Sequence, residues 1–287
     1  MCRWIAYRGE MTALEHYVTE PAHSLISQSI HALEATASVN GDGFGLGWYG
    51  VGNGPGVFRS TEPAWGDANL RHLAGHIESP LFLAHVRATS GTAVQQTNCH
   101  PFMHGRWLFV HNGMINDFHL LRRDLMLAID PSLFSNIEGS TDSEVLFHLA
   151  LTFGLEEDPV AALEQAIGLV EETARQHGVA KAIQASLGVS NGQGLWVVRY
   201  STEGRSRTLF ASADAHALRM LYPDNERVQR LRDEDRIIVS EPLADLSGAW
   251  DELPESTVVA LGPAGRRESR PFRPRPPASA PSVVSTG

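Results

Sequence analysis

The second residue of the chain is the strongest candidate for chemistry. Cys2 follows the initiator Met1, and cysteine is small enough for that methionine to be removed. Cys2 would then carry a nucleophilic thiol and a free α-amine on one residue. An unperturbed α-amine titrates at about pH 8, slightly below a thiol, so the amine can take the thiol proton directly or through a water molecule. The alternative is an ordinary cysteine that acts as a small hydrophobic residue.

Three further segments carry side chains able to bind or polarise a substrate. Arg87 ends an apolar stretch and precedes small hydroxyl residues, which suits a carboxylate because arginine pairs with it in a bidentate fashion. Asn112 and Gly113 offer a side-chain N–H and an unhindered backbone N–H, the donors of an oxyanion hole. Asp142 lies in the first turn of a predicted helix, whose dipole favours a carboxylate that can hold an ammonium group.

Each of these segments also has an interpretation without chemistry. Arg87 could be a solvated strand end. Asn-Gly is the commonest signal for a hairpin turn, and Asp142 could simply help to cap a helix. Taken one at a time, the residues leave these alternatives open.

Composition limits the class of protein. The chain has 287 residues, of which 43% are hydrophobic and 20% charged, as in an ordinary globular protein. A net charge of −10 disfavours nucleic acid and anionic membranes as partners. Cys2 and Cys99 cannot form a disulfide framework, and no signal peptide or membrane span is visible, so we expect a cytoplasmic protein. Thirteen histidines show no metal-binding spacing, and we expect neither a metal nor another cofactor.

The elements that must position these residues are predicted from apolar periodicity. Strands are predicted over residues 3–7, 81–87, 106–110, 183–189, 195–200, 208–211, 236–240 and 256–261, with a glycine-rich turn over 40–50 that feeds a further strand. Helices are predicted over 21–35, 64–77, 118–129 and 159–176, with another that starts at Ser140 or Thr141.

This order of elements predicts an α+β fold in which sheets pack on each other and helices lie outside. No break in composition divides residues 2–262, so we expect one domain there. Residues 263–287 are rich in proline and arginine and nearly lack large apolar side chains. Such a segment cannot offset its ordering entropy, and we expect a disordered tail.

Taken together, the motifs resemble a known family. In order along the chain they are Cys2, Asn40-Gly41-Asp42-Gly43, His85-Val86-Arg87, Asn98-Cys99-His100-Pro101-Phe102, His111-Asn112-Gly113 and Thr141-Asp142-Ser143-Glu144. This set is similar to the glutaminase domain of class II glutamine amidotransferases, which are N-terminal-nucleophile hydrolases. The resemblance extends from residue 2 to about residue 261 and implies a four-layer αββα sandwich.

The resemblance implies three catalytic residues. Cys2 would be the nucleophile, with its own α-amine as the base. The Asn112 side chain and the Gly113 backbone N–H would form the oxyanion hole. Thiolate attack on the side-chain amide would give a γ-glutamyl thioester, which water then hydrolyses.

The resemblance also implies how the substrate is held. Arg87 matches the residue that binds the α-carboxylate of glutamine, and Asp142 matches the one that binds its α-ammonium group. Thr89 and His100 are expected as further substrate-binding residues. The loop after Arg87 lacks the aromatic residue that some synthase-fused members carry.

The expected reaction is hydrolysis of the γ-amide of glutamine or of a γ-glutamyl compound. The chain has no synthase domain, so it resembles the stand-alone members, which include bacterial amidotransferases and γ-glutamyl hydrolases of ergothioneine and glutathione metabolism. Three alternatives stay open: glutamine with a separate synthase or acceptor subunit, direct hydrolysis of a γ-glutamyl amide or peptide, and a non-catalytic amino-acid sensor. The motifs recognise only the γ-glutamyl half, so they do not separate the first two.

Overall fold

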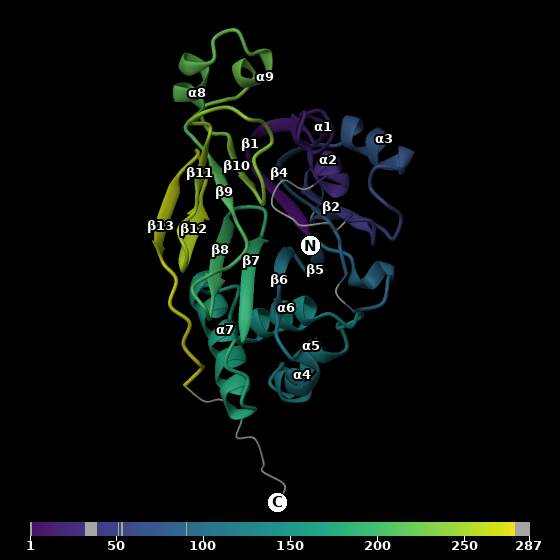
Figure 1. Cartoon of the computed structure of the whole chain (residues 1–287), viewed down its shortest axis with the longest axis vertical. Coiled ribbons are helices and arrows are strands. Elements are labelled where there is room, and N and C mark those ends of the chain that lie inside the picture. Colours follow the sequence, from purple (N-terminus) through teal and green to yellow (C-terminus); the bar gives the residue numbers. More distant parts are fainter. Residues whose placement is uncertain (1, 32–38, 51, 53, 90, 279–287) are drawn as a thin grey trace, which may run out of the picture.

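The computed structural model describes residues 2–31, 39–50, 52, 54–89 and 91–278. Two antiparallel β-sheets lie face to face, and helices pack on their outer sides (Figure 1). The first sheet contains β1 (Arg3–Ala13), β2 (Phe44–Tyr49), β3 (Gly56–Ser60), β4 (Glu78–Val86), β9 (Phe210–Ser212), β10 (Arg236–Val239) and β11 (Trp250–Glu252). The second contains β5 (Phe102–His104), β6 (Trp107–Ile115), β7 (Ile183–Ser190), β8 (Leu195–Ser201), β12 (Thr257–Leu261) and β13 (Arg267–Pro271).

The helices fall into two layers and a small lobe. One layer contains α1 (Glu15–Val18), α2 (Leu25–Ile30) and α3 (Ala68–His76). The other contains α4 (Phe118–Leu127), α5 (Pro131–Phe134), α6 (Asp142–Thr152) and α7 (Pro159–Gln176). The lobe contains α8 (Ala215–Leu221) and α9 (Glu226–Gln229), and a 3₁₀ helix spans Gln96–Asn98. No helix in the described ranges combines the length and the apolar character that crossing a bilayer requires.

The strand order places β1 inside the first sheet. That sheet has the order β11-β9-β10-β1-β4-β2-β3, and the second has the order β13-β12-β8-β7-β6-β5. The N-terminal strand therefore has a partner on each side, β10 and β4. The α+β class and the four-layer αββα sandwich are confirmed.

Alternating side chains on β1 face different layers of the sandwich. Ile5 and Tyr7 pack in a core shared with α1, α2 and α3, whereas Trp4 and Ala6 pack between the two sheets. Because side chains alternate along a strand, Cys2 continues the face of Trp4 and Ala6. The nucleophile candidate therefore lies on the side of β1 that faces the second sheet.

The same alternation applies to β6. Leu108 and Val110 pack between the sheets, whereas Phe109 packs against the helices of the second layer. Asn112 follows on the face of Leu108 and Val110, so it points toward the first sheet. The hairpin alternative for Asn112-Gly113 is wrong, because β6 continues to Ile115 and pairs with β7 along its whole second half.

Two predicted boundaries at the N-terminal end differ from the structure. The predicted strand over 3–7 continues to Ala13. Gly9 does not end it, because a glycine is needed there for close packing against Asp235, and a register shift between Arg8 and Thr12 preserves the pairing with β4. The predicted helix over 21–35 begins only at Leu25, where Ser24 caps it by accepting a hydrogen bond from the Ser27 N–H. Its last part, from residue 32, lies outside the described residues.

The expectation of a disordered tail from residue 263 is wrong as far as the structure describes that segment. β13 pairs antiparallel with β12 and forms the edge of the second sheet. All of its side chains are exposed, so they can be charged while the backbone pairs with β12 on one side. Phe272 then packs into the core at 2% exposure, and the N–H of Arg275 donates to the Glu164 carbonyl on α7. Composition alone therefore concealed an ordered edge strand.

We expect Phe272→Ala to destabilise the protein by about 3–5 kcal/mol, because a buried phenylalanine is removed from a core that cannot fully collapse. Its ring lies 5.6 Å from that of Tyr200 on β8 and anchors the segment that follows β13. Urea unfolding measures the effect. Arg270→Ala, at an exposed position of the same segment, is the matched control and should change stability by less than about 0.5 kcal/mol. Equal stability of the two variants would contradict an anchoring role for Phe272.

Candidate active site

Cys2 lies directly before β1, beside the end of β4. The register pairs Arg3 with Val86, and the half-buried Cys2 thiol lies next to Ala88. The Ala88 N–H donates to Sγ at 3.4 Å, and the Ala88 carbonyl oxygen lies 3.5 Å from it. Burial raises the pKa of the Cys2 thiol, and the Ala88 N–H and nearby positive charges only partly oppose this rise. The protonated thiol is therefore the resting form, and the nucleophile needs a base.

Arg87 is buried, with its guanidinium directed into the loop that follows it. Its Nη2 donates to Thr92 Oγ1 at 2.7 Å and to the Ala93 carbonyl at 3.1 Å, and its Nη1 donates to the Asp42 carbonyl at 3.2 Å. These three acceptors use three of the five guanidinium N–H groups. The three bonds hold the side chain in place. In the described part of the chain the other two N–H groups have no acceptor, so they can still bind a carboxylate.

Thr89 stabilises the same loop. Its backbone N–H donates to a carboxylate oxygen of Asp42 at 2.8 Å, and its hydroxyl donates to the Thr92 carbonyl at 2.8 Å. The structure therefore gives Thr89 a role in loop geometry beside Arg87. Its predicted contact with substrate stays a prediction.

Asn112 presents its side-chain amide toward the first sheet, and Gly113 presents its backbone N–H at the edge of β6 that faces away from β7. Asn112 is 4% exposed, and its side-chain amide has no hydrogen-bond partner among the described residues. The Asn116 N–H bonds to the carbonyl of Ala182, directly before β7, so alternate N–H groups point toward β7 and the Gly113 N–H points away. The pairing of β5 with β6 stops at Phe102, so within the described residues no strand pairs with β6 at the level of Gly113 on that side.

Position 113 requires glycine for packing reasons. A Cβ there would lie 2.0 Å from the Gln184 carbonyl oxygen and 2.4 Å from Nε2 of His111. Both contacts are far shorter than van der Waals distance, so any other residue would displace the strand. The glycine therefore keeps the backbone N–H in place.

Asp142 is tied to β6 close to Gly113. One carboxylate oxygen accepts the Ile115 N–H at 2.7 Å, and the other accepts the Ser143 N–H at 2.8 Å. Thr141 caps α6 by accepting the Glu144 N–H, as the sequence predicts. Each carboxylate oxygen keeps further acceptor capacity, so Asp142 can also bind an ammonium group.

Asn98 connects the two substrate-binding candidates. It is fully buried, and its Nδ2 donates to the Ala93 carbonyl at 2.9 Å and to Ser140 Oγ at 3.2 Å. Its Oδ1 accepts the Ser140 N–H at 2.8 Å. Ala93 also accepts from Arg87, and Ser140 lies directly before the Thr141 cap of α6. The local sequence does not reveal this role, because the two bonds to Ser140 join segments 42 residues apart.

His100 packs inside the protein. It is 4% exposed, and its ring lies 4.2 Å from that of His85 and 4.5 Å from that of Phe102. Burial, and to a smaller extent the neighbouring His85, lowers the pKa of His100 well below its ordinary value, so the ring is neutral. A substrate contact for His100 stays a prediction.

The two halves of the site meet between the sheets. β1 and β4, which carry Cys2 and Arg87 at their ends, both contact β6 (Figure 1). The indole N–H of Trp4 donates across the gap to the Ser186 carbonyl at 3.1 Å, and Ser186 is the direct cross-strand partner of Asn112. The strands next to Cys2 and Arg87 therefore face, across the inter-sheet layer, the strand that carries Asn112.

Two other features lie away from this region. A cavity of about 550 Å³ opens beside the far half of β1, between α1 and α9. Its buried polar groups, Tyr7 and Asp235, bond to each other at 2.5 Å. Within the described residues, one group could hold a metal ion: Glu15, His16 and Glu20, with ligand atoms within 4.8 Å of one another. This group lies beyond the far end of β1 and contributes nothing to the site around Cys2.

Comparisons with known proteins show the family of this chain. The sequence profile of the family described as "Glutamine amidotransferases class-II" matches residues 16–262. The chain belongs to the class II glutamine amidotransferases. The probable glutamine amidotransferase DUG3 of Saccharomyces cerevisiae is 34% identical over 292 residues, an alignment that covers 91% of this chain and 82% of DUG3.

Two further comparisons extend this assignment. The γ-glutamyl-hercynylcysteine sulfoxide hydrolase of Mycolicibacterium smegmatis is 26% identical over 261 residues, covering 90% of this chain and 95% of that protein. A solved class II domain protein from Silicibacter pomeroyi superposes with a TM-score of 0.70 at 33% identity, covering 95% of this chain and all of the other. This class II glutamine amidotransferase is therefore an enzyme of the glutaminase type, and one of its relatives is a γ-glutamyl hydrolase.

Proposed function

We propose that the enzyme cleaves the γ-amide of glutamine or of a γ-glutamyl compound with Cys2 as its N-terminal nucleophile. The observation that supports this proposal is a half-buried thiol directly before β1, a strand that contacts β6, where the Asn112 amide has no hydrogen-bond partner among the described residues. After removal of Met1, the α-amine of Cys2 takes the thiol proton while Sγ attacks the amide carbon. Because burial raises the thiol pKa, this base is needed at neutral pH.

The oxyanion of the tetrahedral intermediate would be stabilised by the buried Asn112 amide and by the Gly113 N–H, which close packing at the glycine keeps in place. The α-ammonium then gives the proton that it took from the thiol to the leaving nitrogen, the C–N bond breaks, and ammonia or an amine is released while a γ-glutamyl thioester stays on Cys2 and the α-amine is free again. Water, deprotonated by the same α-amine, then attacks the thioester and releases glutamate. Sulfur and nitrogen of one residue serve both half-reactions.

Substrate recognition follows from the opposite charges of Arg87 and Asp142. A γ-glutamyl group ends in an α-carboxylate and an α-ammonium, which need one cation and one anion at a fixed separation. Asn98 fixes that separation by joining the Arg87 loop to the start of α6. Only the γ-glutamyl half is recognised in this way, so the group on the other side of the amide can vary.

Direct hydrolysis of a γ-glutamyl amide or peptide is a second candidate activity, supported by the similarity to a γ-glutamyl hydrolase over 95% of its length. Ammonia release from glutamine, compared with amine release from γ-glutamyl peptides, separates this activity from glutaminase chemistry that supplies an acceptor subunit. Mass spectrometry after treatment with diazo-oxo-norleucine tests the shared mechanism. Absence of an adduct on Cys2, together with no turnover of either substrate class, would favour a non-catalytic sensor.

We expect Asp142→Asn to lower kcat/KM by about 10- to 100-fold, mainly through KM, because the ammonium loses a charge-assisted hydrogen bond. Steady-state kinetics with glutamine and with a γ-glutamyl peptide measure the loss. Asp158→Asn is the matched control, since Asp158 caps α7 through the N–H groups of Val160 and Ala161. Unchanged kcat/KM in Asp142→Asn would remove this residue from substrate binding.

A further inference from the structure

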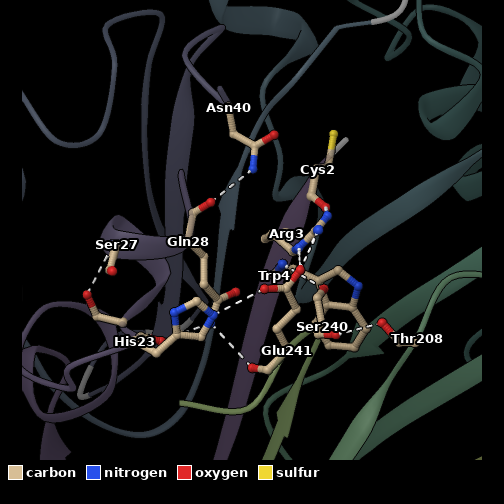
Figure 2. Close-up of polar contacts among 11 residues, drawn as sticks. Cys2, Arg3, Trp4, His23, Ser27, Gln28, Asn40, Thr208, Ser240 and Glu241 are labelled. Atoms are coloured by element: carbon tan, nitrogen blue, oxygen red, sulfur yellow. Dashed lines mark hydrogen bonds and ion pairs between the residues drawn. The ribbon is translucent and has the colours of Figure 1, made fainter. Parts of the chain in front are cut away.

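Arg3 follows the proposed nucleophile, and its side chain turns back toward it. Arg3 is 3% exposed, and its Nη1 donates to the Cys2 carbonyl oxygen at 2.8 Å. Its Nε and Nη2 both contact Oε1 of Glu241, at 2.7 and 2.5 Å. Figure 2 shows the Cys2 sulfur on the side away from this ion pair and the Cys2 carbonyl turned toward Arg3. The guanidinium thus links the Cys2 backbone to a carboxylate.

Glu241 is itself held from several directions. Its side chain is 1% exposed, and its second carboxylate oxygen lies 3.1 Å from Nε2 of His23. Its carbonyl oxygen accepts from Gln28 Nε2 at 3.3 Å. The preceding Ser240 donates its N–H to the Trp4 carbonyl and accepts the Trp4 N–H on its hydroxyl, both at 3.0 Å (Figure 2). The segment after β10 is therefore a fixed support beside the start of β1.

These contacts restrict the orientation of Cys2. Ala88 holds Sγ, and Arg3 holds the carbonyl group. The Cα atom carries nitrogen, carbonyl carbon and Cβ at tetrahedral angles, so fixing two of these substituents fixes the direction of the third. A chain-terminal residue otherwise keeps much conformational freedom, because no preceding peptide restrains it.

We infer that Arg3 is a positioning residue, which Glu241 supports, and that it directs the α-amine of Cys2 toward its own thiol and the substrate. This inference rests on the proposed function, in which that nitrogen is the base. Arginine suits the task because its planar fork serves the carboxylate and the carbonyl at the same time. The ammonium of a lysine is a single point charge, which can pair with Glu241 without holding Cys2 in the same geometry.

The test is Arg3→Lys, which keeps the charge opposite Glu241 and removes the fork. We expect kcat to fall on the order of 10²-fold with KM within about twofold of wild type, because the substrate site is intact and the base is misplaced. Alkylation of Cys2 by iodoacetamide at neutral pH should slow by a similar factor, because the thiol loses its base. Both rates are normalised, by intact mass, to the fraction of protein that lacks Met1.

Arg199→Lys is the matched control. Arg199 is also buried, pairs with Glu252 at 2.6 Å and donates to the Leu253 carbonyl at 2.5 Å, but it lies on β8 away from Cys2. It should keep wild-type kcat and wild-type alkylation even where it lowers the melting temperature. A similar loss of kcat in both variants would overturn the inference, because it would reflect general destabilisation.

Two further results decide the matter. A folded Arg3→Lys protein with kcat and alkylation within about threefold of wild type would overturn the positioning role. Should Arg3→Lys not fold, Glu241→Gln replaces it, since this change keeps the side-chain shape and removes the charge that holds Arg3; the same fall in kcat at constant KM is expected. The proposed function has a separate test: an active Cys2→Ala protein would remove it, whereas an inactive Cys2→Ala protein beside a fully active Arg3→Lys protein removes only the inference about Arg3.

Discussion

Cys2→Ala should lose hydrolysis of glutamine and of γ-glutamyl amides by a factor on the order of 10⁴ or more. The variant keeps the α-amine, Arg87 and Asn112 but has no atom that can form the thioester. Its fold should persist, because Cys2 is only half-buried and its side chain bonds, among the described residues, only to Ala88, at 3.4 and 3.5 Å. Ammonia release or amine release measures the loss, and thermal unfolding verifies the fold.

Cys99→Ala is the control for this variant, because it removes the second thiol of the chain. Cys99 is fully buried, and its Sγ donates to the Ser60 carbonyl at 3.4 Å. Burial raises the pKa of the Cys99 thiol, so it too is protonated at neutral pH. The control should lose some stability and keep kcat. Substantial turnover by Cys2→Ala would show that another group is the nucleophile.

Asn112→Ala should lower kcat on the order of 10²- to 10³-fold, with little change in KM, because an oxyanion donor acts mainly in the transition state. Its amide is 4% exposed and has no partner in the described ranges, so its removal breaks no hydrogen bond seen in the fold. Pre-steady-state measurement of thioester formation gives the effect on the first chemical step directly.

Asn112→Asp sharpens the same test, since its shape is preserved while a negative charge faces the developing oxyanion. We expect it to lose at least as much activity as the alanine variant. Asn116→Ala is the matched control, because Asn116 follows β6 and its amide donates to the Lys181 carbonyl near the surface. If Asn112→Ala and Asn116→Ala had equal kcat, Asn112 would not belong to the oxyanion hole.

The sequence predicted the limits of those helices and strands whose ends are determined by nearby residues. The helix over 159–176 has the predicted limits, because Asp158 caps it, Pro159 suits its first turn and Gly178 follows its end in a left-handed conformation. The strand over 183–189 is also present and ends one residue later, at Ser190. In both cases residues close in sequence decide where the element begins and ends.

Features that depend on distant residues escaped prediction. β13 is a strand because β12 offers an edge for pairing, although its own residues are charged and exposed. Asn98 was part of a motif, but its partners Ala93 and Ser140 reveal its role only in three dimensions. Glu241 gave no local signal at all, because its partner Arg3 lies 238 residues earlier. Contacts of this range are visible only after folding.

The ion pair between Arg3 and Glu241 also determines when the nucleophile can become competent. The ribosome makes β1 first and β10 near the end, so Cys2 emerges long before the carboxylate that anchors its neighbour. On our account, its amine and thiol are not aligned until almost the whole domain has been synthesised. A nascent or truncated chain would thus carry an unassembled nucleophile, and reactivity would begin only with the completed fold.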